Sequence, residues 1–131
     1  MAVSAPLIIV GGGLAGSLAA LMLAGRRPDL PLLLLEAGDS FGGNHTWSFF
    51  DSDVPEGARA LIAALGPVRW PRHRVCFDIR ERVLPMAYNA IGAPALDALV
   101  RERLPAHSWR LGAQVAEVVP HGVTLTSGEH I

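Results

Sequence analysis

The stretch from Pro6 to Glu36 decides the fold of this chain. It contains PLIIV at residues 6–10, GGGLAG at residues 11–16, an apolar segment that fits a helix, and LLLLE at residues 32–36. The order strand, glycine turn, helix, strand and acid is typical of a βαβ unit that binds a dinucleotide. The sequence therefore predicts an α/β fold with a Rossmann-like FAD- or NAD(P)-binding βαβ unit.

Each residue type in this stretch has a physical role. Gly11 permits the tight turn out of the strand, Gly13 leaves room for a pyrophosphate, and Gly16 lets the helix lie close to the sheet. The N–H groups at the start of the helix favour phosphate, and an acid about 20 residues after the last glycine binds the adenosine ribose. The predicted cofactor-binding residues here are Gly11, Gly13, Leu14, Ala15, Gly16 and Glu36.

A membrane-spanning helix is the alternative interpretation of the same stretch. Residues Leu7–Gly25 carry no charge and are followed by Arg26 and Arg27, as in a transmembrane segment with a positive flank. Three consecutive glycines argue against a continuous helix. A signal peptide is disfavoured because no positive charge precedes the apolar part.

The composition limits the classes of function. The chain has 131 residues, is half apolar and has a net charge of −1, which fits one domain and gives no indication of a nucleic-acid partner. Cys76 is the single cysteine, so an internal disulfide is excluded and a reducing cytoplasm is the default. The histidines show no metal-ligand spacing, and no metal site or catalytic residue is predicted.

A second glycine pair follows the acid, at Gly42 and Gly43. In many FAD-binding folds a loop at this position turns back over the cofactor, and glycines permit the positive φ and close approach that this requires. We therefore add Gly43 and Asn44 to the predicted cofactor-binding residues. NADP is disfavoured because Ala37, not an arginine, follows the acid.

The block GGNHTWSF at residues 42–49 resembles the signature of bacterial lycopene β-cyclases. The glycines occur in many flavoproteins, whereas NHTWSF is far more specific. The same order continues through Trp70-Pro71, an arginine-rich strand to Arg82, Tyr88 and a helix near residues 95–104. The resemblance covers essentially the whole chain.

The resemblance implies that residues 1–131 are the amino-terminal FAD-binding region of a larger flavoprotein, with the substrate-binding and catalytic part absent. Such an enzyme closes the ends of lycopene into β-ionone rings by proton-initiated cyclisation, using FAD that NADPH keeps reduced, without net redox change. The implied partners are lycopene or a related carotenoid and a membrane surface, with a cytoplasmic location at the inner membrane. Another FAD-dependent oxidoreductase, such as a monooxygenase, and a truncated inactive chain are the alternatives.

The remaining elements follow from local patterns. Asp53 and Glu56 fit a capping box for a helix to about Leu65. The stretch 72–80 alternates as a strand, with Val75, Phe77 and Ile79 on one face and Cys76, half-buried or buried, on the other. A helix is predicted from Pro94 to Leu104. Residues 114–119 and 123–126 fit a β meander.

Several side chains of the middle region have two interpretations. His45 lies in the predicted flavin loop, where packing and hydrogen bonding are favoured over an acid–base role. Trp47, Phe49 and Phe50 could line a carotenoid channel or join the core. The four arginines of the strand could bind a phosphate or a carboxylate, or lie on a solvated face; their positions are Arg72, Arg74, Arg80 and Arg82.

Overall fold

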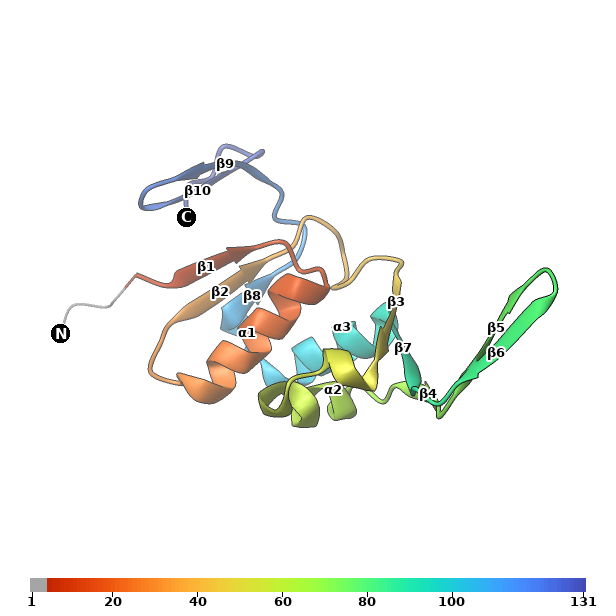
Figure 1. The fold of residues 1–131 in the computed structure, drawn as a ribbon. Coiled ribbons are helices and arrows are strands. Elements are labelled where there is room, and N and C mark those ends of the chain that lie inside the picture. Colours follow the sequence, from red (N-terminus) through yellow and green to blue (C-terminus); the bar gives the residue numbers. More distant parts are fainter. Residues whose placement is uncertain (1–4) are drawn as a thin grey trace.

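The computed structural model describes residues 5–131 and contains the predicted βαβ unit (Figure 1). Strand β1 (Leu7–Val10) leads through the glycine turn into α1 (Leu14–Arg26), and the chain returns as β2 (Leu32–Leu35). The two strands are parallel, with Leu7 opposite Leu32. A third parallel strand, β8 (Trp109–Arg110), pairs with β2, so the order is β1-β2-β8. The α/β prediction is confirmed.

The glycine turn separates β1 from α1, so the stretch is not one continuous helix. Helix α1 begins only at Leu14 and ends at Arg26, and Pro28 follows shortly after. Within the described residues, every helix is too short or too polar to cross a bilayer.

The two faces of the parallel sheet are covered by different elements. Helices α1 and α3 (Ala93–Arg103) lie on one face, and the hairpin of β9 (Val115–Val119) and β10 (Gly122–Leu125) lies on the other (Figure 1). Side chains of β2 alternate between these faces: Leu34 joins the helix-side core and Leu35 the hairpin-side core, as a strand period of two requires. The β meander is confirmed, and Ile131 pairs with Val123.

The helix predicted near residues 94–104 is confirmed. Helix α3 has a proline in its first turn, and Leu104 is its C-cap. Its apolar stripe is buried in the same core as α1 and β2, and consists of Leu96, Leu99, Val100 and Leu104. Pro105 and the short helix η3 (Ala106–Ser108) then lead into β8.

A second, antiparallel sheet has the order β3-β7-β4 and was not predicted. Its strands are β3 (Thr46–Phe50), β7 (Tyr88–Gly92) and β4 (Val68–Trp70). From the sequence alone, no strand is assigned to TWSFF at residues 46–50. Its pairing partner β7 lies about 40 residues away, and nothing local in the sequence indicates that contact.

The helix predicted from an Asp53 cap starts later than expected. Two short helices, η1 (Asp51–Asp53) and η2 (Glu56–Ala58), precede α2 (Arg59–Ala64). The Asp53 carboxylate accepts a hydrogen bond from the Phe50 N–H at 2.9 Å. It therefore closes a turn over residues 50–53 and does not cap a helix that follows it. The capping-box prediction was wrong, whereas the end of the helix before Gly66, at φ 61°, is as predicted.

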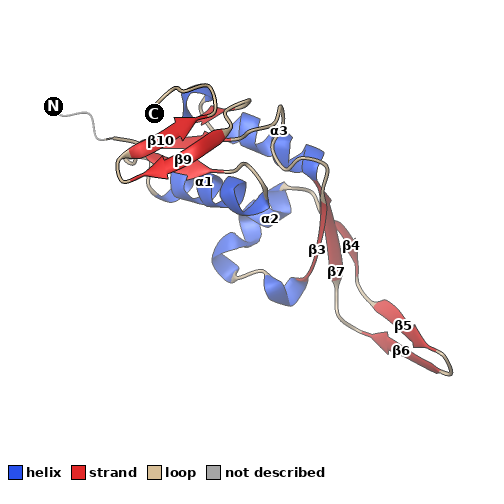
Figure 2. Ribbon diagram, turned by 90° about the horizontal axis from the view of Figure 1, so that it is seen from above, coloured by secondary structure: helices blue, strands red, loops and turns tan. Residues whose placement is uncertain are grey.

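The arginine-rich strand is a hairpin that projects from the molecule (Figures 1 and 2). Strand β5 (His73–Phe77) pairs with β6 (Arg80–Leu84), and Asp78 turns the chain at φ 42°. Ile79 therefore lies in the turn and not in a strand. Cys76 is exposed, so its predicted burial was wrong. The alternation of VCF matches a strand, but no second layer covers it.

Candidate nucleotide-binding site

The turn after β1 is shaped by two glycines with different constraints. Gly11 has φ 98°, in the region that favours glycine, and its N–H donates to the Leu35 carbonyl at 2.8 Å. Gly16 lies against the turn so closely that a Cβ there would collide with the Gly11 carbonyl oxygen. The prediction that Gly16 lets the helix pack tightly is confirmed.

Gly13 is free on its outer side. A Cβ added there would meet no atom within 4 Å, and the residue is the N-cap of α1 without a side-chain cap. The first N–H groups of a helix, here at Leu14, Ala15 and Gly16, have no acceptor within the helix. They and the helix dipole favour an anion at this open position.

The Glu36 carboxylate lies directly beside the glycine turn. Its Oε2 accepts the Gly12 N–H at 2.7 Å, and its Oε1 accepts the Gly38 N–H at 2.7 Å. The acid at the end of β2 and the glycines after β1 therefore meet at the carboxyl edge of the sheet, which is where a doubly wound fold binds nucleotides.

Gly12 has a structural role that the sequence analysis did not assign. A Cβ there would lie 2.5 Å from Phe41 Cδ1 and 3.0 Å from Glu36 Cβ. Its carbonyl accepts the buried Ser17 hydroxyl at 3.0 Å and the Gly42 N–H at 2.8 Å. Three consecutive glycines, where the motif needs only the first and third, were the signal for this contact.

The second glycine pair is joined to the first loop by that bond to Gly42. Gly42 and Gly43 have φ of 81° and 58°, so the predicted positive φ is confirmed. A Cβ on Gly42 would lie 2.8 Å from the Trp47 ring and 3.1 Å from Ala93 Cβ. Gly43 and Asn44 are exposed. The structure thus brings both predicted loops together at one edge.

Helix α3 holds the second loop through an ion pair that the sequence analysis missed. Asp97 Oδ1 accepts the Phe41 N–H at 2.8 Å, and Arg101 Nε donates to Asp97 Oδ2 at 2.8 Å. Arg101 also donates to the Asp39 carbonyl at 3.2 Å and stacks over the Phe41 and Trp109 rings. An Asp–Arg spacing of i,i+4 on a predicted helix was the available signal.

The pKa of Asp97 reflects two opposing effects. Partial burial disfavours the ionised carboxylate, but the hydrogen bonds from Arg101 and from the Phe41 N–H outweigh it. The pKa of Asp97 is therefore held below the ordinary aspartate value. The carboxylate remains charged at neutral pH and keeps both bonds.

The other candidate side chains lie outside the region where the two glycine loops meet. Trp47 and Phe49 pack against the main core, which confirms the core interpretation for both. His45 is exposed, with its ring 6.0 Å from that of Trp47. The arginines of the hairpin are exposed, as on a solvated face. Among the described residues, no three His, Cys, Asp or Glu side chains are placed to hold a metal.

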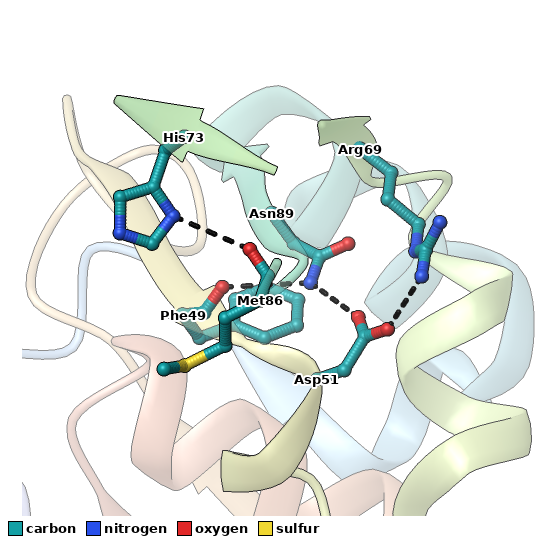
Figure 3. A network of polar contacts seen from close by, with 6 residues as sticks. All are labelled: Phe49, Asp51, Arg69, His73, Met86 and Asn89. Atoms are coloured by element: carbon teal, nitrogen blue, oxygen red, sulfur yellow. Dashed lines mark hydrogen bonds and ion pairs between the residues drawn. The ribbon is translucent and has the colours of Figure 1, made fainter. Parts of the chain in front are cut away.

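A separate polar network ties the second sheet together (Figure 3). Asp51, after β3, receives bonds of 2.7 Å from Arg69 on β4 and from the buried Asn89 on β7. Those two bonds, Arg69 first, lower the pKa of Asp51. The three residues border a cavity of about 430 Å³ beside α2. The network joins the end of β3 to the two other strands of this sheet.

Comparison with known proteins places this architecture in a family. The family model described as lycopene cyclase protein matches residues 6–131. This chain belongs to the lycopene cyclase family. The lycopene cyclase chain is 42% identical over 123 residues to a lycopene beta-cyclase of Pseudescherichia vulneris, which covers 94% of the chain and 32% of that relative. It is 38% identical to the Pantoea ananas lycopene beta-cyclase, over 95% of the chain and 32% of the relative.

Solved structures share the fold of this lycopene cyclase chain. The 2,6-dihydroxypyridine-3-hydroxylase of Arthrobacter nicotinovorans matches with a TM-score of 0.68 and 13% identity, over 100% of the chain and 35% of its own. Klebsiella pneumoniae HpxO, solved with FAD and uric acid, matches with a TM-score of 0.66 and 17% identity. The match covers 97% of this chain and 36% of the HpxO chain. The chain spans about a third of the length of its curated relatives.

Proposed function

We propose that this chain is the FAD-binding part of a lycopene β-cyclase. The observation that carries the proposal is the contact between the Glu36 carboxylate and the Gly12 N–H at 2.7 Å, next to the open position at Gly13. An acceptor for a ribose and a bare backbone for a diphosphate thus lie side by side. Among the ligands and activities that this fold supports, membership of the family favours FAD as the ligand and lycopene cyclisation as the activity.

The chain's own residues would divide the work of holding the cofactor. The helix N-terminus at Leu14 and Ala15 donates to the diphosphate, Glu36 accepts from the ribose, and the exposed Gly43 and Asn44 approach from the second loop. Both loops are already fixed to each other by the Gly42–Gly12 bond, so little ordering is needed on binding. Reduced FAD, when bound, would supply electrostatic stabilisation of cationic character or take part in proton transfer.

The proposal extends to the complete enzyme. Relatives named lycopene beta-cyclase support lycopene or a related carotenoid as the substrate, with cyclisation of its ends and no net redox change. NADPH would keep the flavin reduced. A long hydrocarbon substrate implies a membrane surface as partner, and we place the enzyme in the cytoplasm at the inner membrane. The groups that deliver the proton would lie outside these 131 residues.

Gly13→Val tests the phosphate-binding role directly. A Cβ there meets no protein atom within 4 Å, but the side chain of a valine would fill the position proposed for the diphosphate. We expect the purified chain to bind FAD, and Gly13→Val to weaken that binding by at least about tenfold, or about 1.4 kcal/mol. The measurement is flavin absorbance of the purified protein together with fluorescence titration of added FAD.

Gly25→Val is the matched control, because Gly25 lies in α1 and also has no atom within 4 Å of an added Cβ. It should leave FAD affinity unchanged. Thermal denaturation of both variants separates lost binding from lost folding, since an apolar N-cap at residue 13 costs at most about 1 kcal/mol. Undiminished flavin binding by Gly13→Val would contradict the proposal.

A further inference from the structure

The projecting β5–β6 hairpin carries an apolar surface that this chain leaves open. Most of the exposed large apolar side chains in residues 5–131 lie between residues 68 and 86. Phe77 is 73% exposed and Ile79 is 98% exposed, far more than isolated surface positions require. We define the hairpin surface by the exposed apolar residues of the hairpin face that carries Phe77, of its turn and of its base: Val68, Trp70, Phe77, Ile79 and Met86.

One face of the hairpin forms a groove of defined chemistry. This face carries three apolar side chains, Val75, Phe77 and Leu84. It also carries Arg80 and Arg82, which lie directly opposite Phe77 and Val75 on the neighbouring strand. Together with Ile79 and Glu81 they line an open groove of about 720 Å³. Arg74 is paired with Glu81 at 3.3 Å, whereas Arg80 and Arg82 lack a carboxylate partner among the described residues. The groove suits apolar side chains accompanied by carboxylates.

The hairpin gains little stability from contacts with the rest of this chain. A two-stranded hairpin alone is marginal in water, and here its strand-to-strand pairing is the main contact of β5 and β6. At its base, β4 is an edge strand of the β3-β7-β4 sheet, so its outer backbone groups are free to pair with another strand. Exposed apolar side chains and an open strand edge therefore lie at the base, on β4, and further exposed apolar side chains lie at the tip.

We infer that the hairpin surface packs against the part of a lycopene cyclase polypeptide that this chain does not contain. The inference rests on the proposed function, in which the chain is one part of the enzyme. The curated relatives are about three times as long as the matched region. The solved hydroxylase also matches over all of this chain and 35% of its own length. A segment with apolar side chains and carboxylates would fill the groove and pair with β4.

A polypeptide explains the surface better than a bilayer or a second copy does. A bilayer would cover Phe77 and Ile79 at the tip but leave Val68, Trp70 and the β4 edge at the base. A second copy would bring an identical groove, whose carboxylate at Glu81 is already paired with Arg74, and so would offer no unpaired groove carboxylate to Arg80 and Arg82. A separate segment of the same enzyme could cover both the base and the tip and could supply carboxylates to Arg80 and Arg82.

The test uses a thiol placed in the groove. Cys76→Ala removes the native thiol, and Val75→Cys introduces one of similar apolar character beside Phe77. This chain is produced alone and together with the part of the Pseudescherichia vulneris lycopene beta-cyclase outside the matched 123 residues. If the second segment is insoluble on its own, it is fused to this chain in one polypeptide, and alkylation of the thiol is compared between the fusion and this chain alone. Alkylation of the thiol is followed by mass spectrometry of its peptide.

We expect the two segments to copurify and the Val75→Cys thiol to react at least about tenfold more slowly in the complex. Phe77→Asp should abolish copurification. Val118→Asp, which changes a 70% exposed apolar residue on β9, is the matched control and should not. The readout does not depend on flavin, so it is separate from the test of FAD binding.

Three results would overturn the inference. One is an equally reactive thiol with and without the second segment. Another is flotation of the chain with phosphatidylglycerol vesicles that Ile79→Asp prevents, which would assign the surface to a bilayer. The third is a dimer by light scattering that Phe77→Asp dissociates, which would assign it to a second copy.

Discussion

At the scale of single residues, the four glycines of the turn differ in what they are needed for. Gly11 supplies a positive φ, Gly12 makes room for Phe41, and Gly16 lets α1 approach the turn. Gly13 has a φ of −69°, and a Cβ added there would meet no atom within 4 Å. Backbone conformation therefore accounts for Gly11 and packing for Gly12 and Gly16, whereas for Gly13 we propose the close approach of a ligand.

Gly16→Ala should destabilise the fold even without a ligand. The new Cβ would collide with the backbone oxygen of Gly11, and backbone cannot move aside as a flexible side chain can. We expect a loss of about 1–3 kcal/mol, as for overpacked cores, measured by urea denaturation. Gly13→Ala, whose Cβ meets nothing, is the control and should cost less; equal losses would show that the close approach at Gly16 is not needed.

At the scale of elements, α3 positions a loop that it does not belong to. Asp97 and Arg101, one turn apart, bind the backbone at Phe41 and Asp39, and Phe41 in turn lies against Gly12. The candidate nucleotide-binding site is therefore supported by a helix some 60 residues further along the chain. Sequence-distant support of this kind is common where two loops must keep a fixed separation.

Asp97→Asn should weaken this support in a pH-dependent way. Because the pKa of Asp97 is lowered in the folded chain, its contribution to stability is complete above the unfolded pKa and is lost as pH falls through the folded value. At pH 7 the variant should lose about 1.5–3 kcal/mol, the range for a hydrogen bond to a charged group. The difference should begin to shrink below about pH 4, where aspartate in the unfolded chain protonates, and should vanish only below the lower pKa of the folded chain. Denaturation at several pH values measures both effects.

Asp29→Asn is the matched control for that experiment. Asp29 also has a lowered pKa beside an arginine, because Arg27 donates to it, but the pair is exposed and solvent screens it. Its removal should change stability little at any pH. A difference between wild type and Asp97→Asn that stays constant from pH 7 to pH 3 would contradict the role of the charge.

At the scale of the whole molecule, two hairpins of similar length are held very differently. The β9–β10 hairpin lies on the parallel sheet (Figure 1), and Val123 and Leu125 pack against Leu35. The β5–β6 hairpin projects away from both sheets (Figure 2). The first therefore belongs to the core, whereas the second is left uncovered by the described residues.

Hydrogen exchange of this chain alone should separate the two hairpins. Amides of β5 and β6 open without disturbing the core, so they should exchange much faster than those of β9 and β10, with β2 slowest. Mass spectrometry of peptides from each hairpin measures the difference. Equal protection in both hairpins would show that the projecting one is stabilised within this chain.

The sequence by itself determined the βαβ unit, the two glycine loops, α3 and the β meander. In each case the information is local: a turn residue, a period of 2 or 3.6, or a proline at a helix start. It also placed Glu36 beside the glycine turn, because the carboxyl ends of adjacent parallel strands meet at one edge.

Only the tertiary structure decided the β3-β7-β4 sheet, the role of Gly12, the Asp97–Arg101 support and the exposure of Cys76. Each depends on a neighbour that is distant in sequence or, for Cys76, on the lack of a covering layer in this chain. An alternating strand looks the same whether or not a second layer covers it. Local pattern specifies an element, whereas burial depends on which other elements pack against it.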